Sequence, residues 1–149
     1  MPTNASENMM SIDLLLVDDN DLDIKIAMKA FEFCKKTQIR IHTAKGGEEA
    51  LDFLTQGGNP RPHMVLLDIN MPKISGIEVL DQIKNNKALK DIPVIMLTSS
   101  NSEDDMRVSY KHHANAFVTK AADFDDMVRF ANNIEEFWFL SATLPQEED

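Results

Sequence analysis

Residues 14–20 read LLLVDDN, four apolar side chains followed at once by two aspartates and an asparagine. A similar change recurs at residues 64–69, MVLLDI, where Asp68 interrupts the apolar run. Nearly continuous apolar runs of this length are typical of strands buried on both faces of a parallel sheet. The two stretches therefore predict buried strands that carry carboxylates at or near their ends.

Three further short runs of this kind lie at residues 39–44, 93–97 and 116–119, and the first of the five spans 12–17. Segments of helical periodicity separate them, and helix starts are indicated at Gly76 and at Ser102. Two apolar stripes are predicted to face a core: Ile24, Ala27, Met28, Phe31 and Cys34, and Phe124, Met127, Val128, Ala131, Ile134 and Trp138. The alternation predicts an α/β fold with right-handed crossovers and a parallel sheet covered on both faces.

The composition narrows the classes of function. With 149 residues, 15 basic and 25 acidic side chains and a net charge of −10, the chain fits one domain whose field opposes nucleic acid and anionic lipid. No apolar run approaches the roughly 18 residues of a membrane helix, and no secretory signal is present, which predicts a cytoplasmic protein. We expect a flexible tail at 1–10, the domain at 11–140 and an acidic tail at 141–149.

Ligands of open parallel sheets bind beyond the carboxyl ends of the strands, so the residues that end each run are the candidates for chemistry. They are Asp18, Asp19, Asp68, Thr98 and Lys120. Taken singly, such residues are most often caps, turn residues or solvated charges. Gathered at one edge, two carboxylates about 4 Å apart repel by roughly 4 kcal/mol, which calls for a cation. An all-oxygen ligand set favours Mg²⁺, and a carboxylate beside Mg²⁺, a lysine and a hydroxyl is a plausible nucleophile for phosphoryl transfer.

These residues resemble a known family, the receiver domains of two-component response regulators, over about residues 11–140. Four segments carry the resemblance in order: LLLVDDN, LLDINMPKISG, VIMLTSS and AFVTK. Thr98 follows Asp68 by 30 positions and Lys120 follows it by 52, intervals that suit the family. The stretches IPVIMLTSS, HHANAFVTK and IEEFWF are similar to the stand-alone regulators that partner phytochrome-type histidine kinases.

The resemblance implies a flavodoxin-like, doubly wound (βα)5 fold with five parallel strands in the order 2-1-3-4-5. It implies that Asp68 accepts a phosphoryl group from the phosphohistidine of a kinase. Asp18, Asp19 and Asp68 would hold Mg²⁺, together with the main-chain carbonyl of Asn70.

The resemblance also assigns the neighbouring side chains. Thr98 would hydrogen-bond one phosphoryl oxygen, and Lys120 would pair with another. Phe117 takes the place of the aromatic switch that reports the state of Thr98. Asn70 and Ser100 flank the expected path of the hydrolytic water and would tune the lifetime of the phosphoryl group.

One departure from the family lies after the lysine, where a proline is usual and this chain has Ala121. A cis bond before a residue other than proline costs roughly 2.5 to 4 kcal/mol. We therefore expect a locally altered loop after Lys120. Among the predicted site residues, Lys120 is the one whose position depends on this loop.

Output is expected by protein contact or by onward transfer to a histidine phosphotransfer protein, and the partner implied by the resemblance is a histidine kinase of the phytochrome type. The last predicted helix carries four aromatic residues beyond what one face can bury, Phe130, Phe137, Trp138 and Phe139. They indicate either a surface for a homodimer or for the kinase, or cover for the sheet edge.

Two rival functions remain open. A small-molecule aspartyl-phosphate phosphohydrolase would need a second carboxylate as general acid, and Asn70 stands where such enzymes typically have it. A receiver-like docking module that is never phosphorylated would be favoured if Ala121 displaced Lys120. The residues favour a phosphoacceptor, with self-catalysed transfer and dephosphorylation, over an enzyme.

Overall fold

The computed structural model describes residues 9–99 and 102–145. Residues 1–8, 100–101 and 146–149 lie outside this description. They include most of the predicted amino-terminal tail, the last four residues of the predicted acidic tail, and Ser100, which was predicted to tune the lifetime of the phosphoryl group. Within the described ranges, no helix combines the length and the apolar composition needed to cross a membrane.

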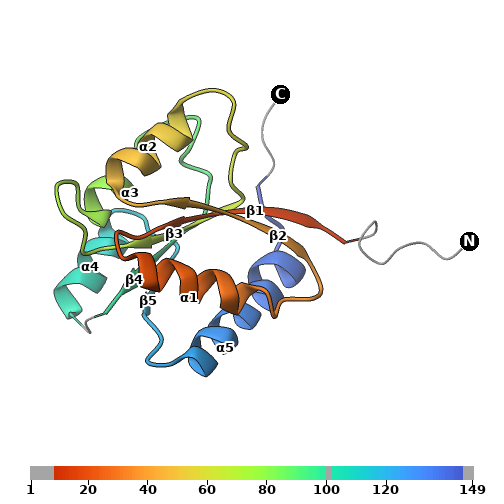
Figure 1. Cartoon of the computed structure of the whole chain (residues 1–149). Helices are drawn as coiled ribbons and strands as arrows, with labels where there is room; N and C mark the ends of the chain where they lie inside the picture. Colours follow the sequence, from red (N-terminus) through yellow and green to blue (C-terminus); the bar gives the residue numbers. More distant parts are fainter. Residues whose placement is uncertain (1–8, 100–101, 146–149) are drawn as a thin grey trace, which may run out of the picture.

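A five-stranded parallel sheet forms the centre of the molecule (Figure 1), in the order β2-β1-β3-β4-β5. The predicted α/β class and strand order are therefore confirmed. The strands are β1 (Ser11–Val17), β2 (Gln38–Ala44), β3 (Met64–Asp68), β4 (Val94–Thr98) and β5 (Ala116–Thr119). They match the predicted runs to within a residue or two at each end.

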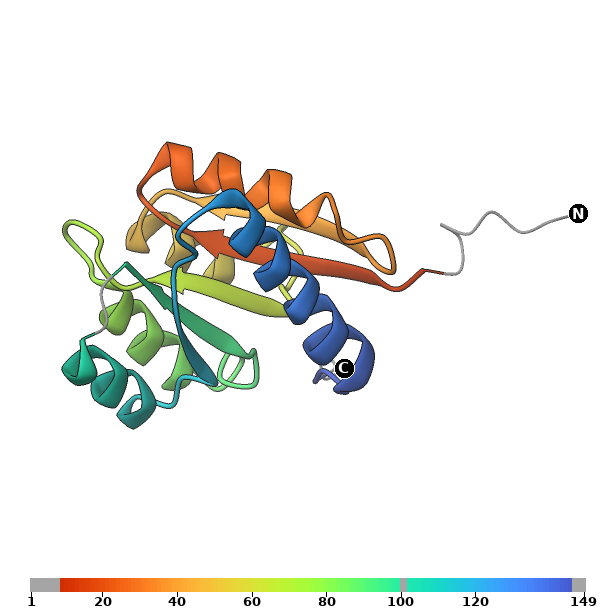
Figure 2. The same cartoon turned by 90° about the horizontal axis from the view of Figure 1, so that it is seen from below.

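Helices cover both faces of the sheet (Figures 1 and 2). The helices are α1 (Asp21–Phe31), α2 (Gly47–Thr55), α3 (Gly76–Lys84), α4 (Glu103–Lys111), α5 (Phe124–Ile134) and the π-helical segment η2 (Glu135–Ser141). Helices α1 and α5 lie on one face, and α2, α3 and α4 lie on the other. This arrangement leaves the carboxyl ends of the strands accessible at one edge.

Alternate side chains of each central strand enter two separate cores, as the pleat requires. Leu14 and Leu16 of β1 pack toward α1 and α5, whereas Leu15 and Val17 pack toward α2 and α3. Strands β1, β3 and β4 are almost wholly buried, but the outer strands β2 and β5 are only partly so. The expectation of strands buried on both faces is wrong for these two, because each has a neighbour on one side only.

The two predicted helical stripes also need correction at one position each. Met28 of α1 and Phe124 of α5 are each 39% exposed, although both fall at apolar spacing. Met28 follows the buried Ala27 and therefore lies toward the edge of the stripe, while Phe124 is the first residue of its helix. An apolar residue at the margin of a stripe is not obliged to reach the core.

The last predicted helix changes its winding near the end. After α5 the chain continues as η2, and the Ala142 N–H donates to the carbonyl of Phe137 at 2.7 Å, five residues back. A wider turn alters which residues face inward. Phe139 is buried whereas Phe137 is 59% exposed, so the prediction that these aromatics cannot all point inward is confirmed.

Candidate functional site

Three carboxylates meet at the carboxyl edge of the sheet. Asp18 and Asp19 directly follow β1, and Asp68 is the last residue of β3. Val17 pairs with Leu67 across these strands, so the register brings Asp18 opposite Asp68. One carboxylate oxygen from each of the three residues lies within 4.8 Å of the others. The sequence prediction that these acids converge is confirmed by their geometry.

The turn after β1 is fixed by its own polar groups. The Asn20 backbone N–H donates to Asp18 Oδ1 at 3.0 Å, and the Asn20 side chain accepts from the Asp23 N–H at 3.0 Å to cap helix α1. The Asp18 N–H donates to the carbonyl of Ala44. The cap gives the Asp23 N–H a partner that it would otherwise lack. The same residue, Asn20, orients the Asp18 carboxylate through its backbone N–H.

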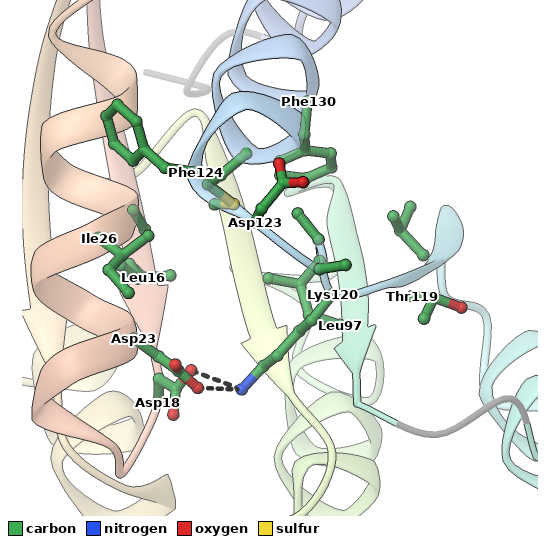
Figure 3. Close-up of a pocket in the computed structure, with 15 residues that line it drawn as sticks. Leu16, Asp18, Asp23, Ile26, Leu97, Thr119, Lys120, Asp123, Phe124 and Phe130 are labelled. Atoms are coloured by element: carbon green, nitrogen blue, oxygen red, sulfur yellow. Dashed lines mark hydrogen bonds and ion pairs between the residues drawn. The ribbon is translucent and has the colours of Figure 1, made fainter.

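Lys120 joins this cluster from the end of β5 (Figure 3). Its Nζ lies 2.9 Å from Asp18 Oδ2, 3.0 Å from Asp23 Oδ2 and 3.6 Å from Asp68 Oδ1. The peptide bond between Lys120 and Ala121 is trans. The absence of proline therefore does not take the ammonium away from Asp68.

The electrostatics of the site set Asp68 apart. Desolvation by burial, assisted by the charge of Asp18, raises the pKa of Asp68 to about 6, although Lys120 and the backbone N–H of Asn70 oppose the shift. Burial also disfavours the charge of Lys120, but hydrogen bonds to Asp18 and Asp23 outweigh it and raise the pKa of the lysine above its ordinary range. One ammonium thus faces several carboxylates, and the site has an excess of negative charge.

The donor set fits a hard divalent cation. Asp18 and Asp68 are 3% and 4% exposed, Asp19 is exposed, and all three offer oxygen within the span of one ion's coordination shell. Magnesium prefers oxygen ligands, uses one or two carboxylates and keeps several waters. The exposed side chain of Asp19 leaves room for such waters. A divalent ion bound here would reduce the repulsion among the three carboxylates.

The other predicted residues lie around the acids. Thr98 ends β4, is fully buried, and accepts the Lys120 backbone N–H on its carbonyl oxygen at 2.6 Å. Asn70 is exposed next to Asp68. Phe117 lies on β5, half-buried against the core beneath α2 and α3. Ser100 lies outside the described residues.

Sequence reasoning missed two residues of this edge. Asp23 contacts Lys120, which the sequence does not signal because an acid in the first turn of a helix is common for electrostatic reasons alone. Gly76, interpreted only as a helix start, abuts β3: a Cβ there would overlap the carbonyl oxygen of Asp68 and lie 2.8 Å from Ile69 Cα. The Gly76 N–H also donates to the Ile69 carbonyl at 2.9 Å. A conspicuous Ser-Gly pair shortly after Asp68 was the available signal.

The chain matches a known family over most of its length. The model of the response regulator receiver domain matches residues 14–132. Among curated proteins, the response regulator Rcp1 of Synechocystis sp. is 40% identical over 139 residues, which cover 89% of this chain and 92% of Rcp1. The probable methanogenesis regulatory protein FilR2 of Methanothrix harundinacea is 43% identical over 128 residues, which cover 84% and 82% of the two chains.

Solved structures agree. The crystal structure of the Mn²⁺-bound form of Rcp1 superposes with a TM-score of 0.82 at 37% identity. That of the phosphorylated cyanobacterial phytochrome response regulator RcpA gives a TM-score of 0.84 at 38% identity. Each comparison covers 91% of this chain and 99% of the other.

Proposed function

Since the chain belongs to the response regulator receiver family, we propose that Asp68 accepts a phosphoryl group from a histidine kinase. One observation carries the proposal: Asp68 is buried at the end of β3, within 4.8 Å of the Asp18 and Asp19 oxygens and 3.6 Å from the Lys120 ammonium. A buried carboxylate with a cation site and a lysine beside it has the groups that phosphoryl transfer requires.

The transfer is a displacement at phosphorus. A carboxylate oxygen of Asp68 forms the new P–O bond while the P–N bond of the phosphohistidine breaks, and the imidazole leaves with the electron pair and is protonated. Asp68 must be ionised to attack, and the Lys120 ammonium favours that form. When bound by Asp18, Asp19, Asp68 and the Asn70 carbonyl, Mg²⁺ supplies charge neutralisation for the transferred group.

The acyl phosphate then acts on the residues around it. It adds nearly two negative charges and three strong acceptors next to Thr98 and Lys120. The Thr98 hydroxyl moves to hydrogen-bond one phosphoryl oxygen, and the half-buried Phe117 turns into the space that is vacated. Hydrolysis returns the carboxylate, with water approaching past Asn70. Phosphorylation thereby shifts the population of the β5 face and its affinity for partners.

The partner is a histidine kinase of the phytochrome type, an assignment supported by the similarity to RcpA, a phytochrome response regulator. Output passes by contact or onward to a histidine phosphotransfer protein in the cytoplasm. Exposed Phe137 and Leu140 on η2 support a further role for the last helix as a contact for a homodimer or for the kinase. Sedimentation of Phe137→Ser tests the homodimer. If the wild type is a dimer through this surface, the variant should sediment with a lower mass than the wild type.

Labelling tests the proposal directly. Acetyl phosphate with Mg²⁺ should add one phosphoryl group to the wild type and none to Asp68→Asn, as measured by intact mass. Asp81→Asn, which changes an acid of α3 away from the site, is the matched control and should label like the wild type. Equal labelling of Asp68→Asn and the wild type would refute the assignment. Catalytic turnover of small phosphoesters would instead favour a phosphohydrolase.

A further inference from the structure

Lys120 is held by an acid that is not part of the three-carboxylate cluster. Asp23 lies in the first turn of α1, and its Oδ2 is 3.0 Å from Lys120 Nζ, nearly as close as the 2.9 Å of Asp18. The ion pair joins α1 to the end of β5, two elements 97 positions apart in the sequence. Figure 3 shows the ammonium pointing toward both carboxylates.

The stem of Lys120 is largely buried, with 20% of the side chain exposed, but it borders a cavity. A pocket of about 210 Å³ lies beside it, between α1 and α5, with mainly apolar walls that include Ile26, Phe124 and Phe130. Ala121 and Ala122, the two residues after the lysine, line the same space with small side chains. Because a lysine stem is flexible and this one borders a cavity, the position of its ammonium depends on the carboxylates that it contacts.

Those carboxylates are not equally available. Asp18 and Asp68 belong to the cluster that fits a divalent ion, whereas Asp23 does not. We infer that Asp23 is a positioning residue, which keeps the Lys120 ammonium beside Asp68 while the other acids serve the metal and the phosphoryl group. The inference rests on the proposed function, because it concerns how Lys120 is prepared for the incoming group.

Helix electrostatics offer a different explanation for an acid in this turn, and the chain provides a control for it. Asp21 occupies the same first turn and has the same charge, so it interacts with the helix dipole in the same way. Asp21 pairs instead with Lys45 at 3.1 Å, and both side chains are exposed. An effect that follows Asp23→Asn but not Asp21→Asn therefore comes from the contact with Lys120.

The first experiment measures the rate of labelling by acetyl phosphate with Mg²⁺. Asp23→Asn should slow labelling by about three- to tenfold, the size expected for loss of one partly exposed ion pair. Asp21→Asn should label like the wild type, and Asp23→Glu, which keeps the carboxylate, should recover most of the rate. In a Lys120→Ala background, Asp23→Asn should have no further effect. Wild-type rates in Asp23→Asn, or an equal slowing in the Lys120→Ala background, would overturn the inference.

The second experiment requires no metal and no phosphorylation. Thermal unfolding in EDTA of the wild type, Asp23→Asn, Lys120→Ala and the double variant should show that Asp23→Asn lowers Tm by about 2–4 °C only when Lys120 is present. Additive effects would overturn the inference. Failure of the wild type to label would count against the proposed function, while the coupling in EDTA would still report on the contact between Asp23 and Lys120.

Discussion

The amino-terminal half of β1 and the carboxyl edge of the sheet each bury an aspartate, and the two carboxylates have very different partners. Asp13 is 5% exposed and Asp68 is 4% exposed. Arg40 donates to both oxygens of Asp13, through Nε at 3.0 Å and Nη2 at 3.1 Å, and His42 Nε2 lies 2.9 Å from Oδ1. Asp68 shares one lysine, at 3.6 Å, with other acids.

The pKa values follow from these partners. Burial works against ionisation of Asp13, but its hydrogen bonds and charge interactions with His42 and Arg40 are together stronger and lower its pKa. At Asp68, burial is the largest effect and raises the pKa to about 6. Similar solvent exposure thus accompanies a carboxylate with two cationic partners at one place and a carboxylate that shares a single ammonium at the other. The difference teaches that the partners of a buried acid decide whether the cost of its burial is offset, as it is at Asp13, or remains, as it does at Asp68.

The sharpest way to break this comparison is to turn each acid into its amide. Asp13→Asn should lower the free energy of unfolding by about 2 kcal/mol, because Arg40 and His42 lose their charged acceptor; the exposure of Arg40 keeps the loss moderate. Asp68→Asn relieves repulsion and should not lower the free energy of unfolding at pH 7. Thermal unfolding in EDTA measures both, with an expected fall in Tm of about 4–8 °C for Asp13→Asn. A comparable fall for Asp68→Asn would contradict the comparison.

The two acids should also give opposite responses to pH. Because the folded pKa of Asp13 is lowered, its contribution to stability is present above its ordinary pKa of 3.8 and is lost as the pH falls below that value. The folded pKa of Asp68 is raised, so the native state binds the extra proton between pH 3.8 and about 6. Its contribution therefore destabilises the metal-free protein progressively as the pH rises through that window.

Urea unfolding in EDTA at pH 4, 5, 6 and 7 measures these slopes. The difference in stability between Asp68→Asn and the wild type should grow by about 2 kcal/mol from pH 4 to pH 7, because a tenfold change in proton affinity between the folded and unfolded states corresponds to about 1.4 kcal/mol. The deficit of Asp13→Asn should stay nearly constant over this range, because the contribution of Asp13 is lost only below about pH 3.8. If the stability difference between Asp68→Asn and the wild type did not change with pH, the pKa of Asp68 would not be raised, and Asp13 and Asp68 would not differ electrostatically in this way.

A third test exploits the tight backbone fit found at the carboxyl edge. Gly76→Ala places a methyl group against the carbonyl of Asp68 and should cost about 1–3 kcal/mol as the start of α3 moves away. Gly46 precedes α2 and has no heavy atom within 4 Å of the position that a methyl group would take, so Gly46→Ala is the control and should be nearly neutral. Thermal unfolding distinguishes them. Equal Tm values for the two variants would show that the contact at Asp68 relaxes freely.

These residues also show how far the sequence could be interpreted. Asp18, Asp19 and Asp68 were predictable because the ends of apolar runs must meet where parallel strands end. The strand order rested on the family resemblance, since the alternation of elements alone does not determine it. The contact of Asp23 with Lys120 depends on where a flexible side chain comes to rest. The burial of Asp13 depends on partners supplied by the next strand, which an apolar run with one acid does not reveal.

The smallest expected effect is that of magnesium, which should act at one end of β1 only. At a concentration ten times its Kd, Mg²⁺ should stabilise the wild type by about 1.4 kcal/mol, because it binds the folded acids and not the unfolded chain. Asp13→Asn should gain the same increment from its lower starting point, since Asp13 already has its charge satisfied by protein groups. Asp68→Asn should gain much less, because one carboxylate ligand is lost. Tm measured with Mg²⁺ and with EDTA gives each increment. If Asp68→Asn gained as much as the wild type, the ion would bind elsewhere, and the excess negative charge at the carboxyl edge would need a different explanation.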